Sequence, residues 1–395
     1  MQALSNTDKE NSITSSFYKH LPGNIICFSH LRWDFVFQRP QHLMTRLSKQ
    51  FNIFFIEEPV LDTDGDAYYV YHQRDDLQVV VPHLPKATHA KDVTRQLKAL
   101  LDDFMSGKSF NNYTFWYYTP MALEFSRKHQ PDLTVYDCMD ELSAFKYAPQ
   151  SLKELEKELL KKADIVFTGG QSLYEAKRDQ HSNIHPFPSS IDKKHFQSAR
   201  DIRMKLKAQG KSDNTVKLGF YGVIDERFDI ELIKGIADAR PNWQIILLGP
   251  VVKIDAAQLP ANKNIHYPGA KTYQQLPAYL AEWDVALIPF LLNESTKFIS
   301  PTKTPEYLAA GVPVISTAIR DVVNPYGKNK LVKIAATAKE FITEAEKPMQ
   351  ALEKENWLVH VDEFLSQNSW DNTCSRMLNL MSKTIAGRSL SSIAQ

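Results

Sequence analysis

The segment SPTKTPEYLAAGVPVIST, residues 300–317, places a lysine, a proline and a glutamate at the start of one short predicted helix. Thr304 can cap a helix whose first residue is Pro305, because threonine is a common N-cap and proline is tolerated at the first position. Gly311 is expected to end this helix after fewer than two turns. Glu306 then lies in the first turn, beside free N–H groups that favour an anion. The segment therefore predicts a phosphate site at the start of the helix.

The side chains around this helix start are suited to a nucleoside diphosphate. Ser300 and Thr302 would offer hydroxyl groups to the diphosphate, and Lys303 would offer an ammonium group. Glu306 could accept hydrogen bonds from both hydroxyls of a ribose, as acidic residues do in other nucleotide sites. A glutamate in a first helical turn also complements the helix dipole without any ligand. The sequence leaves both interpretations of Glu306 open.

Three glycines at predicted strand ends point to the same edge of a sheet: Gly222, Gly249 and Gly269. A glycine at such a position lets the backbone approach a ligand closely. Arg227 follows Gly222 by five residues and could hold a phosphate with two parallel hydrogen bonds. The alternative is a turn of charged residues on the surface.

The segment HLRWDFVFQRPQHL, residues 30–43, joins the first predicted strand to the first predicted helix. Several of its polar side chains are candidates for substrate contacts: His30, Arg32, Asp34, Gln38 and Arg39. Trp33, Phe35 and Phe37 could stack on a sugar ring or touch a lipid. For Phe35 and Phe37 we prefer a core position, because their side chains share one face of an extended segment.

Two further carboxylates, Asp140 and Glu141, follow another predicted strand. A carboxylate at a strand end could orient an acceptor hydroxyl, or it could cap the following turn. Both alternatives stay open.

The elements that must position these residues alternate between strand and helix, which predicts two doubly wound α/β domains facing each other across a cleft. Ligands of such sheets bind beyond the carboxyl ends of the strands. The expected strands are 24–30, 51–59, 76–85, 113–120, 133–140 and 164–170, then 216–222, 243–250, 264–269, 284–290 and 312–317. The irregular, basic and polar segment 184–214 between the two series is taken as the junction. The predicted divisions are a tail (1–20), a first domain (21–200), a second domain (201–369) and a final helix (370–395).

Composition excludes several classes of function. Lys and Arg number 47 and Asp and Glu 46, so a nucleic-acid-binding surface is not expected. The histidines show no metal-ligand spacing, and no metal site is predicted. Three unpaired cysteines fit a reducing compartment. Neither a signal peptide nor a membrane span is expected, so we predict a cytoplasmic protein.

Four stretches together carry a family resemblance: residues 33–47, WDFVFQRPQHLMTRL; residues 161–178, KKADIVFTGGQSLYEAKR; residues 187–196, FPSSIDKKHF, where relatives often read NGVD; and residues 300–317. With the tandem α/β pattern, they make the chain resemble the GT-B glycosyltransferases of the large retaining family 4. That family includes many bacterial cell-envelope and polysaccharide enzymes. The resemblance extends from residue 24 to about residue 380.

The resemblance implies a nucleotide-sugar donor, UDP- or GDP-linked, on the second domain and a carbohydrate, lipid-linked or small-molecule acceptor on the first. It implies retention of configuration, with no metal or other cofactor, and a final helix from about Trp370 that returns to the first domain. Glu306 matches the glutamate that binds the donor ribose. His30 and Asp140 are the candidates for the catalytic group of the first domain, beside Arg227 and Lys303. The acceptor would meet Arg32, Trp33, Asp34, Arg39 and Glu141, and peripheral contact with the cytoplasmic face of a membrane is possible.

The chain departs from the family pattern at two places. Phe298 stands where relatives usually have a second glutamate, eight residues before Glu306, and Asn293 or Glu294 could replace it. Val223 stands where relatives have an arginine, and Arg227 takes the position of a lysine. These departures keep two alternatives open: a nucleotide-sugar epimerase on the same scaffold, and an inactive sugar-binding partner.

Overall fold

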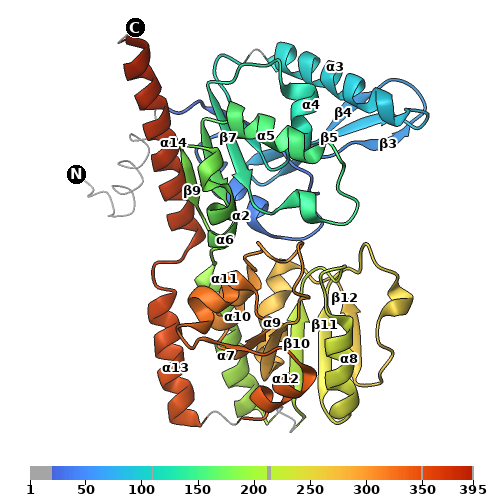
Figure 1. Cartoon of the computed structure of the whole chain (residues 1–395), viewed down its shortest axis with the longest axis vertical. Coiled ribbons are helices and arrows are strands. Elements are labelled where there is room, and N and C mark those ends of the chain that lie inside the picture. The colour runs from blue at the N-terminus through green and yellow to red at the C-terminus, as the bar shows by residue number, and fades with distance from the viewer. Residues whose placement is uncertain (1–19, 109, 211–214, 348–349, 394–395) are drawn as a thin grey trace.

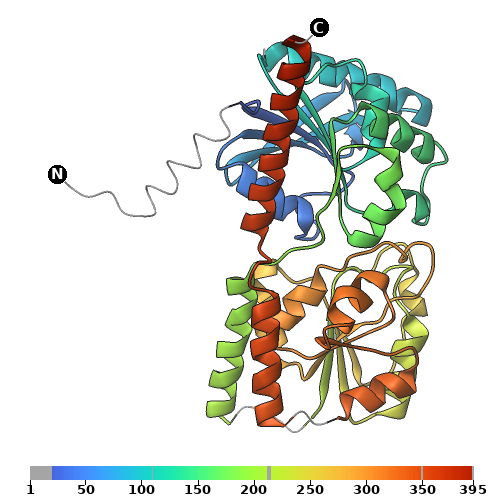
Figure 2. The same cartoon turned by 60° about the vertical axis from the view of Figure 1, so that its left-hand side comes forward.

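The computed structural model describes residues 20–108, 110–210, 215–347 and 350–393, which form two α/β domains stacked end to end (Figure 1). The tail expected over residues 1–20 lies outside the described residues except for His20. Each domain is a sheet flanked by helices, as the turned view shows (Figure 2).

The first domain contains a nine-stranded sheet in the order β3-β5-β2-β1-β6-β7-β8-β9, with β4 paired to β5. Its strands are β1 (Asn24–Phe28), β2 (Asn52–Ile56), β3 (Val60–Thr63), β4 (Tyr68–Arg74), β5 (Leu77–Pro85), β6 (Thr114–Tyr117), β7 (Leu133–Cys138), β8 (Ile165–Thr168) and β9 (Ile184–Pro186). The β4–β5 pair is antiparallel, and the other pairs are parallel. The helices are α2 (Arg39–Leu47), α3 (Ala90–Lys108), α4 (Leu123–Ser126), α5 (Leu152–Lys162) and α6 (Gln171–Lys177).

Alternation along the strands explains why helices cover both faces of this sheet. In β1, Ile25 and Cys27 belong to one core, with α2, while Ile26 and Phe28 belong to another, with α3 and α5. Successive side chains of a strand point to opposite faces, so a continuously apolar strand needs a layer of helices on each side.

The second domain contains a parallel six-stranded sheet in the order β12-β11-β10-β13-β14-β15. Its strands are β10 (Lys217–Tyr221), β11 (Gln244–Leu248), β12 (Ile265–Gly269), β13 (Val285–Ile288), β14 (Val314–Ser316) and β15 (Val332–Ile334). Its helices are α7 (Lys193–Ala208), α8 (Ile230–Ala239), α9 (Leu276–Glu282), α10 (Lys303–Ala309), α11 (Arg320–Val322), α12 (Ala338–Ala345) and α13 (Ala351–Phe364).

The segment expected to be irregular, 184–214, contains the long helix α7, and that expectation was wrong. Asp192 caps α7 by accepting a hydrogen bond from the backbone of His195 at 3.3 Å. Ile191, Phe196 and Ala199 pack in the core of the second domain. The change of core therefore comes near residue 191, ahead of the boundary placed at residue 200. Charged residues hid the helix in the sequence because they cover its exposed side.

The last helix, α14 (Trp370–Ile393), leaves the second domain and lies along the first (Figures 1 and 2). Trp370, Cys374 and Met377 belong to a core of the first domain, whereas Val361 of α13 belongs to the second. The two connections between the domains also meet, because the backbone N–H of Trp370 donates to the carbonyl oxygen of Ile191 at 3.3 Å. The expected return of the final helix is confirmed. No helix in the described ranges combines the length and apolar character needed to span a bilayer.

Candidate functional site

A cleft of about 520 Å³ lies between the two domains, at the carboxyl ends of both sheets. The first domain lines it with the loop after β1 and with residues following β7 and β8. The second domain lines it with the residues after β10, β11, β12 and β13 and with the start of α10. Of the predicted donor site, Gly222, Gly249, Ser300 and Thr302 line this cleft, as do Arg227, Lys303 and Glu306.

Helix α10 begins two residues earlier than its sequence suggested. Its first residue is Lys303 and its N-cap is Thr302, so the predicted cap at Thr304 and start at Pro305 were wrong. The backbone of Thr302 already has helical φ and ψ angles of −55° and −31°, and a proline is accommodated within the first turn. Gly311 ends the helix with a φ of +70°, which favours glycine.

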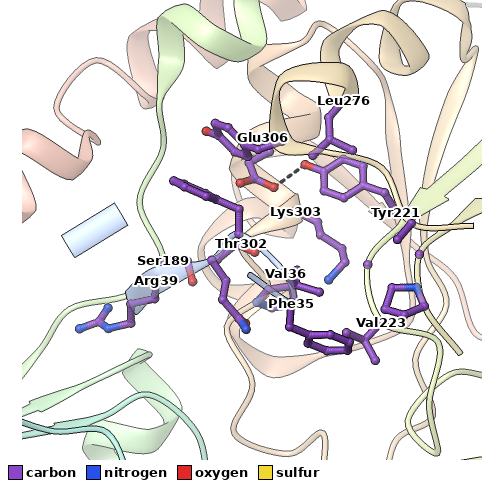
Figure 3. Close-up of a pocket in the computed structure, with 18 of the residues that line it drawn as sticks. Phe35, Val36, Arg39, Ser189, Tyr221, Val223, Leu276, Thr302, Lys303 and Glu306 are labelled. Atoms are coloured by element: carbon purple, nitrogen blue, oxygen red, sulfur yellow. Dashed lines mark hydrogen bonds between the residues drawn. The ribbon is translucent and has the colours of Figure 1, made fainter. Parts of the chain in front are cut away.

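Glu306 is held by a tyrosine that the sequence analysis missed. The hydroxyl of Tyr221, the last residue of β10, donates a short hydrogen bond to Oε2 of Glu306 (Figure 3). Burial raises the pKa of Glu306 to about 7, although the Tyr221 hydrogen bond and the charge of Lys303 both act to lower it. An aromatic residue directly before the strand-end glycine was the available signal.

Lys303 brings an unpaired cation into the cleft. Its ammonium has no hydrogen bond or ion pair within the part of the chain that the structure describes, and it lies 5.5 Å and 5.7 Å from the ring centres of Phe220 and Phe290. Burial and the positive charge of Arg227 lower the pKa of Lys303 to about 8. A partly buried cation without an anion is suited to an anionic ligand, because the negative charge of the ligand compensates for the hydration that the ammonium loses on burial.

Gly222 makes room for this lysine, and Gly249 makes room for the backbone of Gly222. A Cβ on Gly222, where φ is +136°, would lie 2.3 Å from Cε of Lys303, and a Cβ on Gly249, where φ is +142°, would lie 1.9 Å from the carbonyl oxygen of Gly222. These glycines thus permit close contact between strand ends and the lysine. Gly269 does not line the cleft, and a Cβ there would meet nothing within 4 Å.

Arg227 reaches the cleft as half of an ion pair. Its Nη2 donates to Oδ2 of Asp225 at 2.6 Å and its Nε to Oδ1 at 3.0 Å, and its side chain is 21% exposed. Phe145, from the first domain, packs against the guanidinium at 5.1 Å. The sequence analysis missed Asp225, which orients the arginine and offsets part of its charge.

Asp140 is one of two carboxylates that the first domain contributes to the cleft lining, the other being Asp34. Burial raises its pKa to about 6, while Arg227, Arg39 and Lys303 act to lower it. The described residues provide its carboxylate with no hydrogen bond. Asp140 therefore faces the cations of the second domain and has capacity left for a substrate hydroxyl.

Three other predicted residues of the first domain lie outside the cleft lining. His30 is enclosed, and burial lowers its pKa to about 4. The guanidinium of Arg32 donates to Oε2 of Glu57 at 2.9 Å and to the carbonyl oxygen of Glu58 at 2.6 Å. Glu141 pairs with Lys177 at 2.8 Å, which makes its role structural.

Residues 33–39 line the cleft, but which of their aromatic side chains are buried and which are exposed differs from the expectation. Trp33 packs edge-on against Phe55, with ring centres 5.0 Å apart, and is 9% exposed. Phe35 and Phe37, which we expected in the core, are 44% and 39% exposed and line the cleft. The expectation failed because residues 33–35 form a turn, so the alternation of an extended strand does not apply across this segment.

Both charged residues of this loop are already paired. Asp34 forms an ion pair with Arg74 at 2.7 Å on the surface. Arg39 donates to Asp137 at 2.8 Å and to the carbonyl oxygen of Phe187 at 2.7 Å, and its guanidinium points away from Glu306 and Lys303 (Figure 3).

Of the two residues that depart from the family pattern, Phe298 lies outside the cleft lining and Val223 lies within it. Phe298 turns from the cleft and packs against a core of the first domain, and neither Asn293 nor Glu294 lines the cleft in its place. Asn293 caps its own turn by accepting from the backbone of Ser295 at 3.0 Å. Val223 does line the cleft, where an arginine is usual. Among the described residues, no three His, Cys, Asp or Glu side chains are grouped as metal ligands.

Comparison with solved structures defines the fold as GT-B. Sucrose-phosphate synthase from Thermosynechococcus elongatus superposes with a TM-score of 0.68 at 14% identity, over 92% of this chain and 99% of that one. An E. coli trehalose-6-phosphate protein bound with UDP-2-fluoro glucose gives 0.66 at 11% identity, over 91% and 99%. Anabaena HepE in complex with UDP gives 0.63 at 12% identity, over 91% and 99%.

Comparison of sequences agrees with this class. Residues 218–350, which lie in the second domain, match the family model described as glycosyl transferases group 1. A Bacillus subtilis protein, described as putative teichuronic acid biosynthesis glycosyltransferase TuaH, is 22% identical over 239 residues. That match takes in 56% of this chain and 60% of the relative's length. The resemblance to GT-B glycosyltransferases inferred from the sequence is confirmed.

Proposed function

We propose that this chain transfers a sugar from a nucleoside-diphosphate sugar to a carbohydrate hydroxyl, using the cleft between its domains. The observation that carries this proposal is the pair of Lys303 and Glu306 on the first turn of α10. One is a cation without a partner and the other a carboxylate, and both face the same cleft. The ligands named for the Anabaena and E. coli structures, UDP and UDP-2-fluoro glucose, support a nucleotide-sugar donor.

In this proposal the second domain binds the donor. Lys303 and Arg227 stabilise the charge of the departing diphosphate, while Glu306 accepts a hydrogen bond from the ribose. These side chains place the sugar toward the first domain, where Asp140 can orient the acceptor hydroxyl.

The transfer step follows from this placement. The bond between the anomeric carbon and the phosphate oxygen breaks, and a bond to the acceptor oxygen forms on the same face, which retains the configuration. The acceptor proton passes to the released diphosphate. The chain's own cations supply the charge stabilisation in this scheme.

The proposal also includes the kind of acceptor and the location of the protein in the cell. The teichuronic acid relative supports a polysaccharide or its lipid-linked precursor as acceptor. The three cysteines are buried free thiols, which supports a cytoplasmic location. Contact with a membrane surface stays a prediction, to be checked by co-sedimentation with anionic vesicles.

Calorimetric titration with UDP and GDP tests the donor site. We expect one of them to bind and Glu306→Ala to abolish that binding, because a buried hydrogen-bond acceptor is lost. Unchanged affinity in the variant would contradict the proposal. Incubation of UDP-sugars without acceptor provides the second arm: an isomerised donor would favour the epimerase, and absence of any nucleotide binding would favour an inactive partner.

A further inference from the structure

Tyr221 is held rigidly beside the candidate donor site. Its ring lies edge-on to Tyr307, with ring centres 4.9 Å apart, and 6.3 Å from Trp283. Its backbone N–H donates to the hydroxyl of Tyr307 at 3.0 Å. Strand pairing to β11 fixes the backbone of the same residue. These contacts therefore hold the phenol in one orientation, in which its hydroxyl points to Glu306.

The contact leaves the two oxygens of Glu306 in different states. Oε2 accepts the hydrogen bond from Tyr221, whereas Oε1 receives none from the described residues. Glu306 is 5% exposed, and both residues line the cleft. A carboxylate on a flexible side chain can otherwise present either oxygen, and fixing it beforehand reduces the entropy lost when a ligand binds.

We propose that Tyr221 is a positioning residue for nucleoside recognition: its hydroxyl fixes Oε2 of Glu306, so that Oε1 is presented to a ribose hydroxyl. This inference rests on the proposed donor site and adds a residue that recognises the nucleoside only through Glu306. It explains why a tyrosine precedes Gly222 at the end of β10.

The hydrogen bond also stabilises the ionised form of Glu306. The titratable groups that face this carboxylate are Tyr221 from β10, Lys303 and Tyr307 from α10, and Tyr273 after β12. Of these, Tyr221 and Lys303 lower the pKa of Glu306 against the effect of burial. Removing the phenol hydroxyl therefore raises this pKa, and the carboxylate becomes neutral at a higher pH.

The test is the pH dependence of UDP or GDP affinity, whichever the wild type binds, in Tyr221→Phe and wild-type protein. A charge-assisted hydrogen bond corresponds to about one pKa unit or more. We expect Tyr221→Phe to bind about tenfold more weakly near pH ~6 and by a clearly smaller factor near pH ~8.5, where Glu306 is ionised in both proteins and only the loss of positioning remains. The ratio of the two affinities cancels the titration of the ligand and of Lys303, which are common to both proteins.

Two further variants separate positioning from a general structural effect. Tyr136→Phe removes a buried tyrosine hydroxyl that donates to Oε1 of Glu156 at 2.7 Å outside the cleft lining, and it is expected to leave the pH at half-maximal affinity unchanged. In a Glu306→Gln background, which cannot ionise, Tyr221→Phe is expected to leave no pH-dependent loss. Thermal unfolding of each variant reports whether it is folded.

The outcomes distinguish failure of the proposed donor site from failure of the role assigned to Tyr221. If the wild type binds neither nucleotide, the proposed function fails and this inference fails with it. If the wild type binds, but Tyr221→Phe is unchanged or weaker by the same factor at every pH, only the role of Tyr221 is overturned.

Discussion

The side chain of Lys303 occupies the space beside Gly222 where any other residue would have its Cβ. That Cβ would lie 2.3 Å from Cε and 2.6 Å from Nζ of the lysine. The strand-end glycine and the helix-start lysine therefore depend on each other, although 81 positions separate them in the sequence. The glycine brings β10 and α10 together at the point where we propose the diphosphate binds.

Gly222→Ala is expected to weaken UDP or GDP binding at least tenfold, because the new Cβ displaces the ammonium of Lys303. The matched control is Gly210→Ala, which also has a positive φ (+66°) but meets nothing within 4 Å. Both variants carry backbone strain of about 1 kcal/mol or more, so their thermal stabilities should both fall. Equal nucleotide affinities in the two variants would contradict the role assigned to Gly222.

Lys303→Met is expected to reduce turnover by about a hundredfold, the loss typical of one removed electrostatic donor. It should also stabilise the fold by about 1 kcal/mol, because a partly buried cation without a partner is replaced by an apolar side chain of similar length. The lowered pKa means that the folded state holds fewer protons than the unfolded state between about pH 8 and ~10.5. Wild-type stability at this site therefore rises with pH over that window. Denaturant melts at several pH values should show this rise in the wild type and a smaller one in the variant.

Asp140→Asn is expected to lower turnover by about a hundredfold while the nucleotide still binds, because this residue is proposed to act on the acceptor. The wild-type rate should fall as the pH drops below about 6, where the carboxylate becomes protonated. Initial rates and nucleotide titrations on the same samples separate the two steps. A variant that loses nucleotide binding and turnover together would place Asp140 in the donor site.

Arg39→Ala is expected to destabilise the protein by about 3–5 kcal/mol, because it leaves Asp137 charged and buried without a partner. The control is Arg32→Ala, which removes a guanidinium that is 39% exposed and should cost about 1 kcal/mol or less. Urea unfolding measures both. If Arg39→Ala kept its stability and raised the KM for the acceptor, the arginine would bind substrate as its sequence position first suggested.

The apolar runs at residues 24–30 and 216–222 were enough to predict two doubly wound domains. Strands with such runs need a layer of helices on each face of their sheet, and this three-layer arrangement defines the fold class. The edge strand β4 was missed because six of its seven residues are tyrosine, histidine, glutamine or arginine and none of the seven is buried, so no apolar run marked it. Helix α7 was missed because its exposed side is crowded with lysine and arginine.

The sequence by itself determined the repeated α/β pattern, the existence of a short helix that ends at Gly311 and the residues offered to a diphosphate, since each depends on neighbours along the chain. Only the tertiary structure decided which of those residues meet. It joined Tyr221 to Glu306, turned Phe298 from the cleft, paired Arg39 with Asp137 and exposed Phe35. The physical reason is that burial and partners across domains set the charge state and direction of a side chain, and both arise from contacts between residues far apart in the sequence.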